Sequence, residues 1–547
     1  MSARPPVTAS SRRPGRLLVG LVAGVLSGLA GGLAPARAGD AAADFATFST
    51  FFRKELDSDK PEARMRAVRR AQETVDPRTI ELLFEAEAKE VLRRTATDKA
   101  RTEAEASLET ALGEIEKLQK QSPRTPKEIE AFNKKVKGVE AKRDDLSARL
   151  RDLAVDAVQG DAVLGAMVGA MGALLDKLPP ATVSGALALA AERWANPKAS
   201  IDRQVRQVDL LAAITTHPTA ALLRAIVKDA ARDARVRTVA LGARLARGDE
   251  GLLDDCVGLL CDPPGPLLTQ AVDGLRRIHK TECIEPLIAF LGRADLGRLR
   301  EDARRSLASL TGEKHGPYQQ PWADWWKDAK ATFKLPSRPA DVADLSKPDQ
   351  GVTFYGITSF SDKVLFILDV SGSMKDKAHE DATGVRGEEA KIDVARREVV
   401  SALAMLDEKK TFNAIFFNHR VVRWQGAMTA ADRASVDRAK RFAQELEPSG
   451  GTNIHDALEA AFQLAGVLSS TGVDGKLYLP IIDTIYFMTD GTPTAGKLVK
   501  PDDILGAVRG WNRLAKIQIH CVGVGDACDV KFLAQLAKEN GGTFVHR

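Results

Sequence analysis

The feature that most limits the possible folds is a series of short apolar runs that alternate with amphipathic segments after Lys363. The first run, 364–370, is followed by an amphipathic stretch at 393–406 and by a second apolar run at 412–417. This alternation predicts a parallel sheet with helices on both of its faces. Strands buried on both faces show no polar alternation, which accounts for the unbroken apolar character of the first run. Residues 351–547 are therefore expected to form a doubly wound α/β domain of Rossmann type.

Oxygen-bearing side chains stand where these strands should end. The first run leads into DVSGSM, which places Asp369, Ser371 and Ser373 on the turn that leaves the strand. A later apolar run ends in Asp490, and between the two runs a glycine-rich loop brings Thr452 to the start of a helix. In such sheets, ligands bind beyond the carboxyl ends of the strands. The three loops are therefore expected to converge on one site.

Two carboxylates and three hydroxyls form a set of ligands that contains only oxygen, which suits a hard divalent cation. Mg²⁺ takes about six oxygen ligands, often including water, and Mn²⁺ accepts the same kind of ligand. With few carboxylates bound directly, the ion would keep a net positive charge and attract an acidic group from outside. In a different interpretation the same side chains only cap helices and stabilise turns, because Ser, Thr and Asp are common at such positions.

Three short motifs occur in a fixed order along this part of the chain. DVSGS (Asp369–Ser373), GGTN (Gly450–Asn453) and MTDG (Met488–Gly491) together resemble the metal-ion-dependent adhesion site of von Willebrand factor type A domains. The likeness covers about residues 363–547.

This resemblance implies a role for each of the five residues. The hydroxyls of Ser371, Ser373 and Thr452 would bind the ion, and Asp369 and Asp490 would bind it directly or through water. An Asp or Glu of a protein partner would complete the shell.

The resemblance also implies a protein that binds a ligand and is not an enzyme. The sequence shows no paired nucleophile and base, no G-x-S-x-G and no H-E-x-x-H. Two alternatives stay open: a metal-dependent hydrolase, and a structural scaffold whose metal site is empty.

One segment departs from the family pattern. Residues 375–391 are a polar stretch between the serine turn and the first helix, where the family usually enters the helix quickly. It could shape partner choice, supply an acid to the ion, or project as a disordered surface insertion. The acids in question are Glu380, Asp381, Glu388 and Glu389. Near the expected rim of the site, His419 and His455 are both expected to be solvated.

The chain before this domain is expected to be entirely helical. After a short helical segment at 39–79, residues 80–158 carry a heptad pattern on two arms that are separated by the sequence QSPRTP, whose prolines must end a helix. The arms are expected to form an antiparallel helical hairpin, or alternatively two solvated helices of a larger bundle.

Within 159–332, apolar positions recur every 32 residues. Leu211, Ala243, Leu275 and Leu307 keep this spacing, and a second series follows Ile214, Ala246, Ile278 and Leu310. Such a period indicates helix pairs that bury their apolar faces by stacking, and the stretch resembles HEAT-like repeats of an α-solenoid. An irregular helical bundle is the alternative. Residues 333–350, rich in Pro and Asp, are expected to be a linker.

The first 38 residues resemble an export signal. Arg12, Arg13 and Arg16 precede an apolar run that ends near the small-residue pattern Ala36-Arg37-Ala38, although an uncleaved anchor is the alternative. Removing the five leader arginines from the 79 basic residues leaves 74 against 74 acidic ones, so charge gives no reason to expect nucleic-acid binding.

We therefore expect an exported protein with no membrane span after cleavage of the leader. Whether Cys521 pairs with Cys528 in an oxidising compartment stays open.

Overall fold

A computed structural model describes residues 38–338 apart from 122, 124, 195–199 and 216–218, and residues 352–547 apart from 378–388 and 468–480. The expected signal and most of the expected linker lie outside the described residues. Contacts divide the chain into two compact units. Among described residues, the first comprises 38–87 and 165–247, and the second comprises 88–164 and 248–547.

The C-terminal part of the second unit is the expected α/β domain. Its main sheet has the order β5-β4-β3-β7-β8-β9, with β6 paired to β4, and the neighbouring pairs from β4 to β9 are parallel. A short antiparallel ribbon, β1 (Val352–Phe354) with β2 (Ile357–Ser359), precedes it. The strands of the main sheet are β3 (Lys363–Asp369), β4 (Thr411–Phe417), β5 (Val421–Arg423), β6 (Thr429–Ala430), β7 (Thr484–Thr489), β8 (Gln518–Gly523) and β9 (Phe544–His546).

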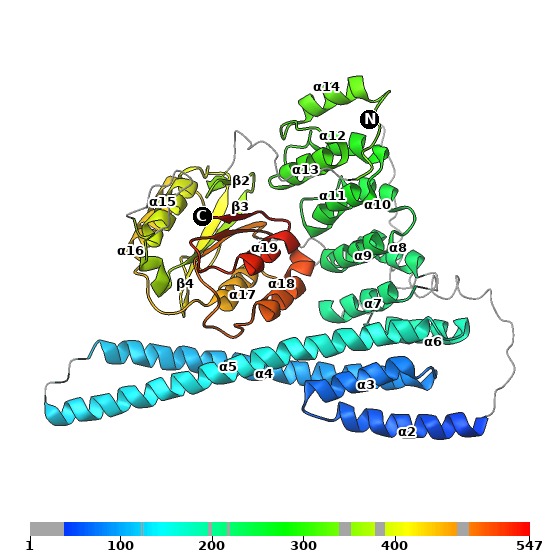
Figure 1. Cartoon of the computed structure of the whole chain (residues 1–547), viewed down its shortest axis with the longest axis horizontal. Helices are drawn as coiled ribbons and strands as arrows, with labels where there is room; N and C mark the ends of the chain where they lie inside the picture. The colour runs from blue at the N-terminus through cyan, green and yellow to red at the C-terminus, as the bar shows by residue number, and fades with distance from the viewer. Residues whose placement is uncertain are drawn as a thin grey trace, which may run out of the picture. The chain divides into compact units, whose positions relative to one another are not determined.

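Helices cover both faces of this sheet (Figure 1). On one side lie α15 (Lys391–Ala404) and α16 (Arg433–Glu445); on the other lie α17 (Ile454–Leu464), α18 (Pro501–Ala515) and α19 (Val530–Glu539). The fold class inferred from the alternation of apolar runs is therefore confirmed.

The register of the central strands sets the position of the site. Leu368 of β3 is level with Met488 of β7, and Asp369 is level with Phe417 of β4. The carboxyl ends of the three strands therefore lie at one edge of the sheet, and the loops that follow them start side by side. Aromatic packing supports this core, since the rings of Phe366 and Tyr486 stack with centroids 5.6 Å apart.

The charged segment forms two long helices, α4 (Arg78–Gln119) and α5 (Pro126–Leu175), of which Figure 1 shows the antiparallel hairpin. The predicted seam residues pack together, including Ile115, Leu118, Val139 and Leu146. Helix α5 continues well past the expected boundary at residue 158: glycines follow at 160, 165, 169 and 172, but no proline interrupts the apolar sequence.

The start of α5 has a clear local cause. Thr125 Oγ1 accepts a hydrogen bond from the Glu128 backbone N–H at 3.3 Å, and the Glu128 carboxylate accepts one from the Thr125 N–H at 3.0 Å. This reciprocal pair is a capping box.

The first unit holds α2 (Ala38–Leu56), α3 (Pro61–Glu73), α6 (Pro180–Trp194), α7 (Ile201–Ala213), α8 (Ala220–Lys228) and α9 (Ala234–Arg247), together with the adjoining ends of α4 and α5. Gly172 of α5 lies against Ala213 of α7 so closely that a Cβ at Gly172 would collide with it. The ring of Phe84 packs on Trp194 at 5.2 Å between centroids.

The second unit continues the helical pattern with α10 (Leu252–Leu259), α11 (Pro266–Ile278), α12 (Ile284–Phe290), α13 (Leu299–Thr311) and α14 (Gln319–Ala329). Alternate helices of the two units begin at Ile201, Ala234, Pro266 and Leu299, which agrees with the 32-residue period. Most of the predicted positions are buried, but Ala246 is exposed at the end of α9. The likeness to HEAT repeats stays a prediction.

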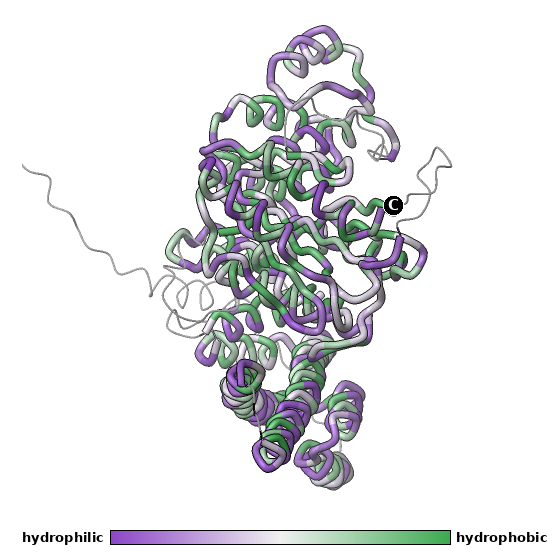
Figure 2. The backbone as a smooth tube through the Cα atoms, turned by 90° about the vertical axis from the view of Figure 1, so that its left-hand side faces the viewer, coloured by the Kyte–Doolittle hydropathy of each residue, from purple (hydrophilic) through white to green (hydrophobic). Residues whose placement is uncertain are grey.

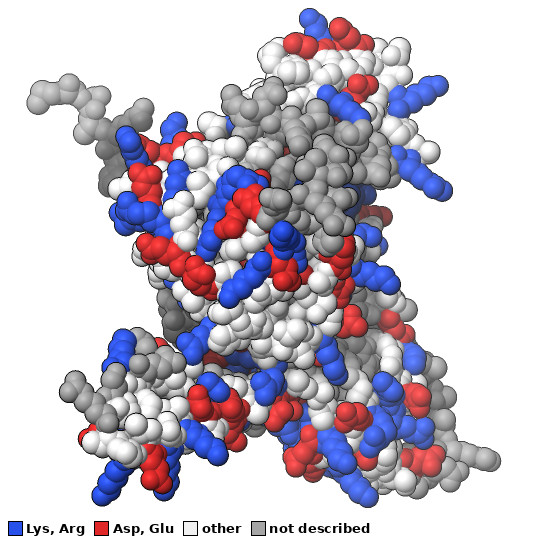
Figure 3. All heavy atoms as spheres, turned by 60° about the vertical axis from the view of Figure 1, so that its left-hand side comes forward, with Lys and Arg blue, Asp and Glu red and all other residues white. Residues whose placement is uncertain are grey.

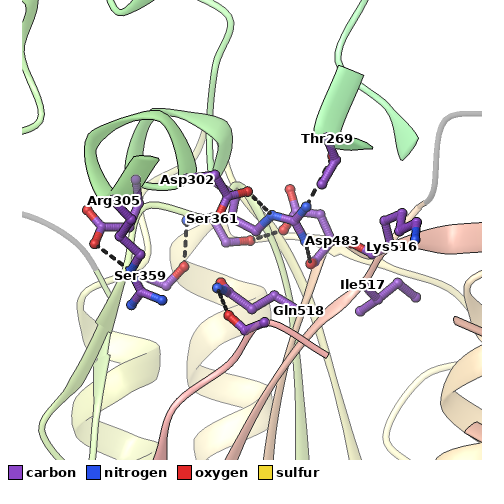
Figure 4. A network of polar contacts seen from close by, with 12 residues as sticks. Thr269, Asp302, Arg305, Ser359, Ser361, Asp483, Lys516, Ile517 and Gln518 are labelled. Atoms are coloured by element: carbon purple, nitrogen blue, oxygen red, sulfur yellow. Dashed lines mark hydrogen bonds and ion pairs between the residues drawn. The ribbon is translucent and has the colours of Figure 1, made fainter. Parts of the chain in front are cut away.

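Arg298 joins these last helices to the edge of the sheet opposite the site. Its partners Thr269, Asp302, Asp483 and Lys516 are labelled in Figure 4. Its guanidinium donates hydrogen bonds to the backbone carbonyls of Asp483 at 2.6 Å and Lys516 at 2.8 Å, which precede β7 and β8. It also contacts the Asp302 carboxylate at 3.1 Å and Thr269 Oγ1 at 3.2 Å. The Arg298 side chain therefore satisfies polar groups of the helices and of the sheet domain.

Hydrophilic and hydrophobic residues alternate along the helices (Figure 2), as expected of amphipathic elements. On the face seen in Figure 3, acidic and basic side chains are interspersed.

Among described helices, α5 alone has the length and composition of a membrane span, and 56% of its apolar window is buried inside the protein. Cys521 and Cys528 are both buried, unpaired thiols.

Candidate metal centre

Asp369 ends β3 and is completely buried. One of its carboxylate oxygens accepts a hydrogen bond from the Ser371 backbone N–H at 2.7 Å, and the other accepts one from Thr489 Oγ1 at 2.5 Å. Burial raises the pKa of Asp369 to about 6, and the nearby Asp490 carboxylate adds to the increase, whereas the hydrogen bonds from Thr489 and Ser371 oppose it. The buried carboxylate is therefore held in a position where a cation would stabilise its charge.

The two serines connect the first loop to the third. The hydroxyls of Ser371 and Ser373 lie 3.2 Å apart, and Ser373 Oγ donates a hydrogen bond to Asp490 Oδ1 at 2.8 Å. Asp490 follows β7 directly and is fully buried. Four of the five predicted residues therefore form a continuous chain of hydrogen-bonding groups, running from Asp369 through the serines to Asp490.

Thr452 belongs to the loop between these two strands. Its backbone carbonyl accepts a hydrogen bond from the Thr494 N–H at 2.9 Å, while its own N–H donates to Thr494 Oγ1 at 2.8 Å. A Cβ placed on Gly491 would lie 3.2 Å from Thr452 Oγ1, so the hydroxyl is adjacent to the residue after Asp490. The loop is held from the other side by the Gly372 N–H, which donates to the Gly450 carbonyl at 2.9 Å.

The structure thus brings all five predicted residues to one edge of the sheet. They supply two carboxylates and three hydroxyls, and neither nitrogen nor sulfur belongs to the set. This composition fits Mg²⁺ or Mn²⁺ and suits softer metals poorly. Asp369, Ser371 and Ser373 come from the β3 turn, Thr452 from the loop before α17, and Asp490 from the end of β7.

One residue of the site was missed in the sequence. In the sequence Lys391 ends the polar stretch 375–391, but in the structure it is the first residue of α15, and its ammonium group lies 2.9 Å from Asp490 Oδ2. Only 7% of the Lys391 side chain is exposed. The local signal was weak: Lys391 begins an amphipathic run, and a buried partner 99 positions away leaves no trace in the neighbouring sequence.

The polar stretch is closed at its base. The Lys391 N–H donates to the Asp376 carbonyl at 2.9 Å, and Lys377 pairs with Ala390 as an antiparallel bridge. Glu389, one of the acids considered for the ion, instead pairs with Arg397 at 2.5 Å. Glu380, Asp381 and Glu388 lie outside the described residues.

A second polar cluster lies on α17, beside the site. His455 contacts Asp456 at 2.7 Å and is buried, so its expected solvation was wrong; His419 is exposed as expected. His455, Asp456 and Glu459 have the geometry of a metal cluster, but Lys497 Nζ already donates to Glu459 at 2.6 Å.

The same Lys497 also reaches the helical hairpin. Its ammonium donates to Glu105 of α4 at 2.5 Å, and Arg101 of α4 contacts Glu459 at 3.4 Å. The cluster is therefore a network of ion pairs between α4 and the elements that follow Thr452 and Asp490.

The family model described as "von Willebrand factor type A domain" matches residues 170–253 and 362–546. The second segment spans the sheet, its helices and all five candidate residues. The C-terminal domain is a von Willebrand factor type A domain. The stretch 170–253 lies in the helical part and contains none of the strands described above.

Curated relatives match the same domain. The chain is 31% identical over 187 residues to human inter-alpha-trypsin inhibitor heavy chain H4, covering 34% of this chain and 18% of that protein. It is 31% identical over 182 residues to heavy chain H2 of Mesocricetus auratus, covering 33% and 17%. The chain thus spans less than a fifth of the length of these relatives.

Solved structures are also similar over about a third of the chain. A von Willebrand factor type A protein from Catenulispora acidiphila has 21% identity and a TM-score of 0.27, covering 35% of this chain and 40% of that one. An aerotolerance-related membrane protein from Bacteroides fragilis has 19% identity and a TM-score of 0.25, covering 34% and 90%.

Proposed function

We propose that the von Willebrand factor type A domain binds a protein ligand through one divalent cation, Mg²⁺ or Mn²⁺. Ser371, Ser373 and Thr452 would offer hydroxyls to the ion, and Asp369 and Asp490 would bind it directly or through water. An Asp or Glu side chain of the ligand would fill the remaining position. The helical parts would act as a scaffold, and the leader would export the protein to the cell envelope or beyond.

The observation that carries this proposal is the hydrogen-bonded path from Asp369 to Asp490. Burying two carboxylates next to each other is unfavourable unless a positive charge compensates them. The domain nevertheless places both at the carboxyl edge of the sheet, with three hydroxyls beside them. The Lys391 ammonium offsets the charge of Asp490, and a divalent cation would offset that of Asp369. Hydroxyl ligands would leave the ion partly uncompensated.

The proposal predicts that the full chain binds one Mg²⁺ or Mn²⁺ per molecule. Asp369→Ala should lower the affinity at least about tenfold, because it removes one of two carboxylates from a site with few other charges. Ser373→Ala should weaken binding less, since it removes one neutral ligand. Titration calorimetry with MgCl₂ and MnCl₂ measures both effects.

Asp407→Ala is the matched control. Asp407 lies between α15 and β4, where its carboxylate pairs with Lys410 at 3.6 Å at the opposite edge of the sheet. Its removal should leave the metal affinity unchanged. Equal affinity of the wild type and Asp369→Ala would contradict the proposed site.

A further inference from the structure

Lys391 holds a position that the metal proposal does not account for. It begins α15, and its backbone is fixed to the end of the serine loop by the hydrogen bond to the Asp376 carbonyl. Its side chain runs inward and is nearly completely buried. Lys side chains are rarely buried to this extent unless they are paired.

The partner of Lys391 is one of the proposed metal ligands. Asp490 Oδ2 accepts the hydrogen bond from Lys391 Nζ at 2.9 Å, while Oδ1 accepts the one from Ser373 at 2.8 Å. Both oxygens of Asp490 are therefore engaged, and only Oδ1 faces the serines that would contact the ion. The fixed ammonium group cancels one of the two negative charges of the site.

A purely structural ion pair would be the simplest explanation. Buried ion pairs contribute little net stability, however, because desolvating the two charges offsets their attraction. This pair also uses the carboxylate that the ion needs, although other described acids of the domain are available at its surface. Its location therefore has a consequence for the ion that an ion pair elsewhere would not have.

We propose that Lys391 tunes the charge of the metal site: it lowers the affinity for the divalent cation and leaves the bound ion more positive toward an acidic ligand. The inference deepens the proposed function and rests on it. Like charges repel strongly in a site shielded from water, so a fixed ammonium next to Asp490 opposes entry of the ion. With the negative charge of Asp490 already shared, a bound ion attracts an outside carboxylate more strongly.

The test compares Mn²⁺ binding to the full chain and to Lys391→Met, with Mn²⁺ alone as the probe and electron paramagnetic resonance as the readout of free ion. Lys391→Met should bind Mn²⁺ at least about tenfold more tightly than the wild type. Lys391→Gln, which keeps a hydrogen-bond donor but no charge, should behave like Lys391→Met. If Lys391→Gln kept the wild-type affinity, geometry and not charge would be responsible, and the inference would be wrong.

Thermal unfolding gives a second readout, which does not rely on measuring the concentration of free Mn²⁺. Lys391→Met leaves Asp490 without a cationic partner, so the metal-free variant should melt below the wild type. Saturating Mn²⁺ should then raise its Tm by more than it raises that of the wild type, because a ligand bound only by the folded state stabilises it in proportion to the logarithm of its affinity. An equal or smaller increase would overturn the inference.

Lys410→Met is the matched control. Lys410 is also a mostly buried lysine paired with an aspartate, Asp362 at 3.1 Å, but it lies directly before β4, at the other edge of the sheet. The Lys410→Met variant should be less stable than the wild type but should bind Mn²⁺ with unchanged affinity.

The outcomes separate this inference from the proposed function. Mn²⁺ binding by Lys391→Met but not by the wild type would support the inference and contradict the proposed function. Tight binding by the wild type with no gain in Lys391→Met would support the proposed function and contradict the inference. Binding by neither protein would overturn both.

Discussion

Gly450 holds the metal loops together without contributing a ligand. Its φ of +73° lies in the left-handed region, and a Cβ at this position would collide with the ring of His419. Its carbonyl accepts the hydrogen bond from Gly372 between the two serines. The glycine is therefore required both for its backbone conformation and for the close approach of a neighbouring side chain.

Gly450→Ala should destabilise the domain by at least about 2 kcal/mol, since the left-handed conformation alone costs about 1–2 kcal/mol for a residue with a Cβ. It should also weaken Mn²⁺ binding, although every ligand is intact, because the loop has to move away from His419. Urea unfolding and Mn²⁺ titration measure the two effects. Gly466→Ala separates them: Gly466 has a φ of +74° but open space around it, so this variant should lose stability and keep its metal affinity.

At this scale the sequence predicts the five oxygen-bearing residues at the edge of the sheet but not their neighbours. The five oxygen-bearing residues were predicted because each follows an apolar run or a glycine turn, which is a local signal. The pairing of Lys391 with Asp490 and the burial of His455 arise from the packing of distant segments. Such contacts have no signature in the adjacent residues, so these two features could not be predicted.

Among the elements, the base of the polar stretch 375–391 is the most informative. The Lys377 bridge to Ala390 and the hydrogen bond from Lys391 to Asp376 bring its two ends together before α15 begins. The chain therefore enters α15 from a position that does not depend on the length of the intervening segment.

Strand and helix positions in this domain were well predicted because apolar runs and helical periodicity are local. The expected boundary at residue 158 is wrong, because the change in composition there is not accompanied by a proline and the helix continues through the glycines that follow.

Replacing residues 378–389 by Asn-Gly, a dipeptide suited to a tight antiparallel turn, should preserve the fold and the metal affinity within about threefold. The Glu389–Arg397 pair lost in this variant is exposed and contributes little. Circular dichroism and Mn²⁺ titration test the outcome. A large gain in affinity would instead show that an acid of the segment occupies the site, and a large loss would show that the segment helps to bind the ion.

For the molecule as a whole, Arg298 is a link between helices α11 and α13 and the sheet. Its side chain is almost entirely buried and contacts the carbonyls of two residues that precede strands, a carboxylate and a hydroxyl. The sequence predicted helical repeats and an α/β domain but gave no sign of this contact, because it joins residues up to 218 positions apart. The helices thus contact the sheet at the edge where β7 and β8 begin, and the proposed metal site lies at the opposite edge.

Arg298→Met should lower the stability of the protein by about 3–5 kcal/mol, since it removes the guanidinium from the Asp302 carboxylate and from the Lys516 carbonyl and leaves the Asp483 carbonyl with only the Gln518 N–H. Thermal and urea unfolding measure the loss. The control is Arg277→Met, which removes an exposed pair with Asp273 and should cost less than about 1 kcal/mol. A similar effect of the two variants would mean that the Arg298 contacts do not hold the two parts together.

The location of a bound ion tests the central claim most directly. Crystals grown in MnCl₂ and measured at the manganese absorption edge should show one anomalous peak at the carboxyl edge of the sheet, about 2.0–2.3 Å from Ser371 Oγ and Ser373 Oγ. A peak elsewhere, or none at millimolar Mn²⁺, would contradict the account.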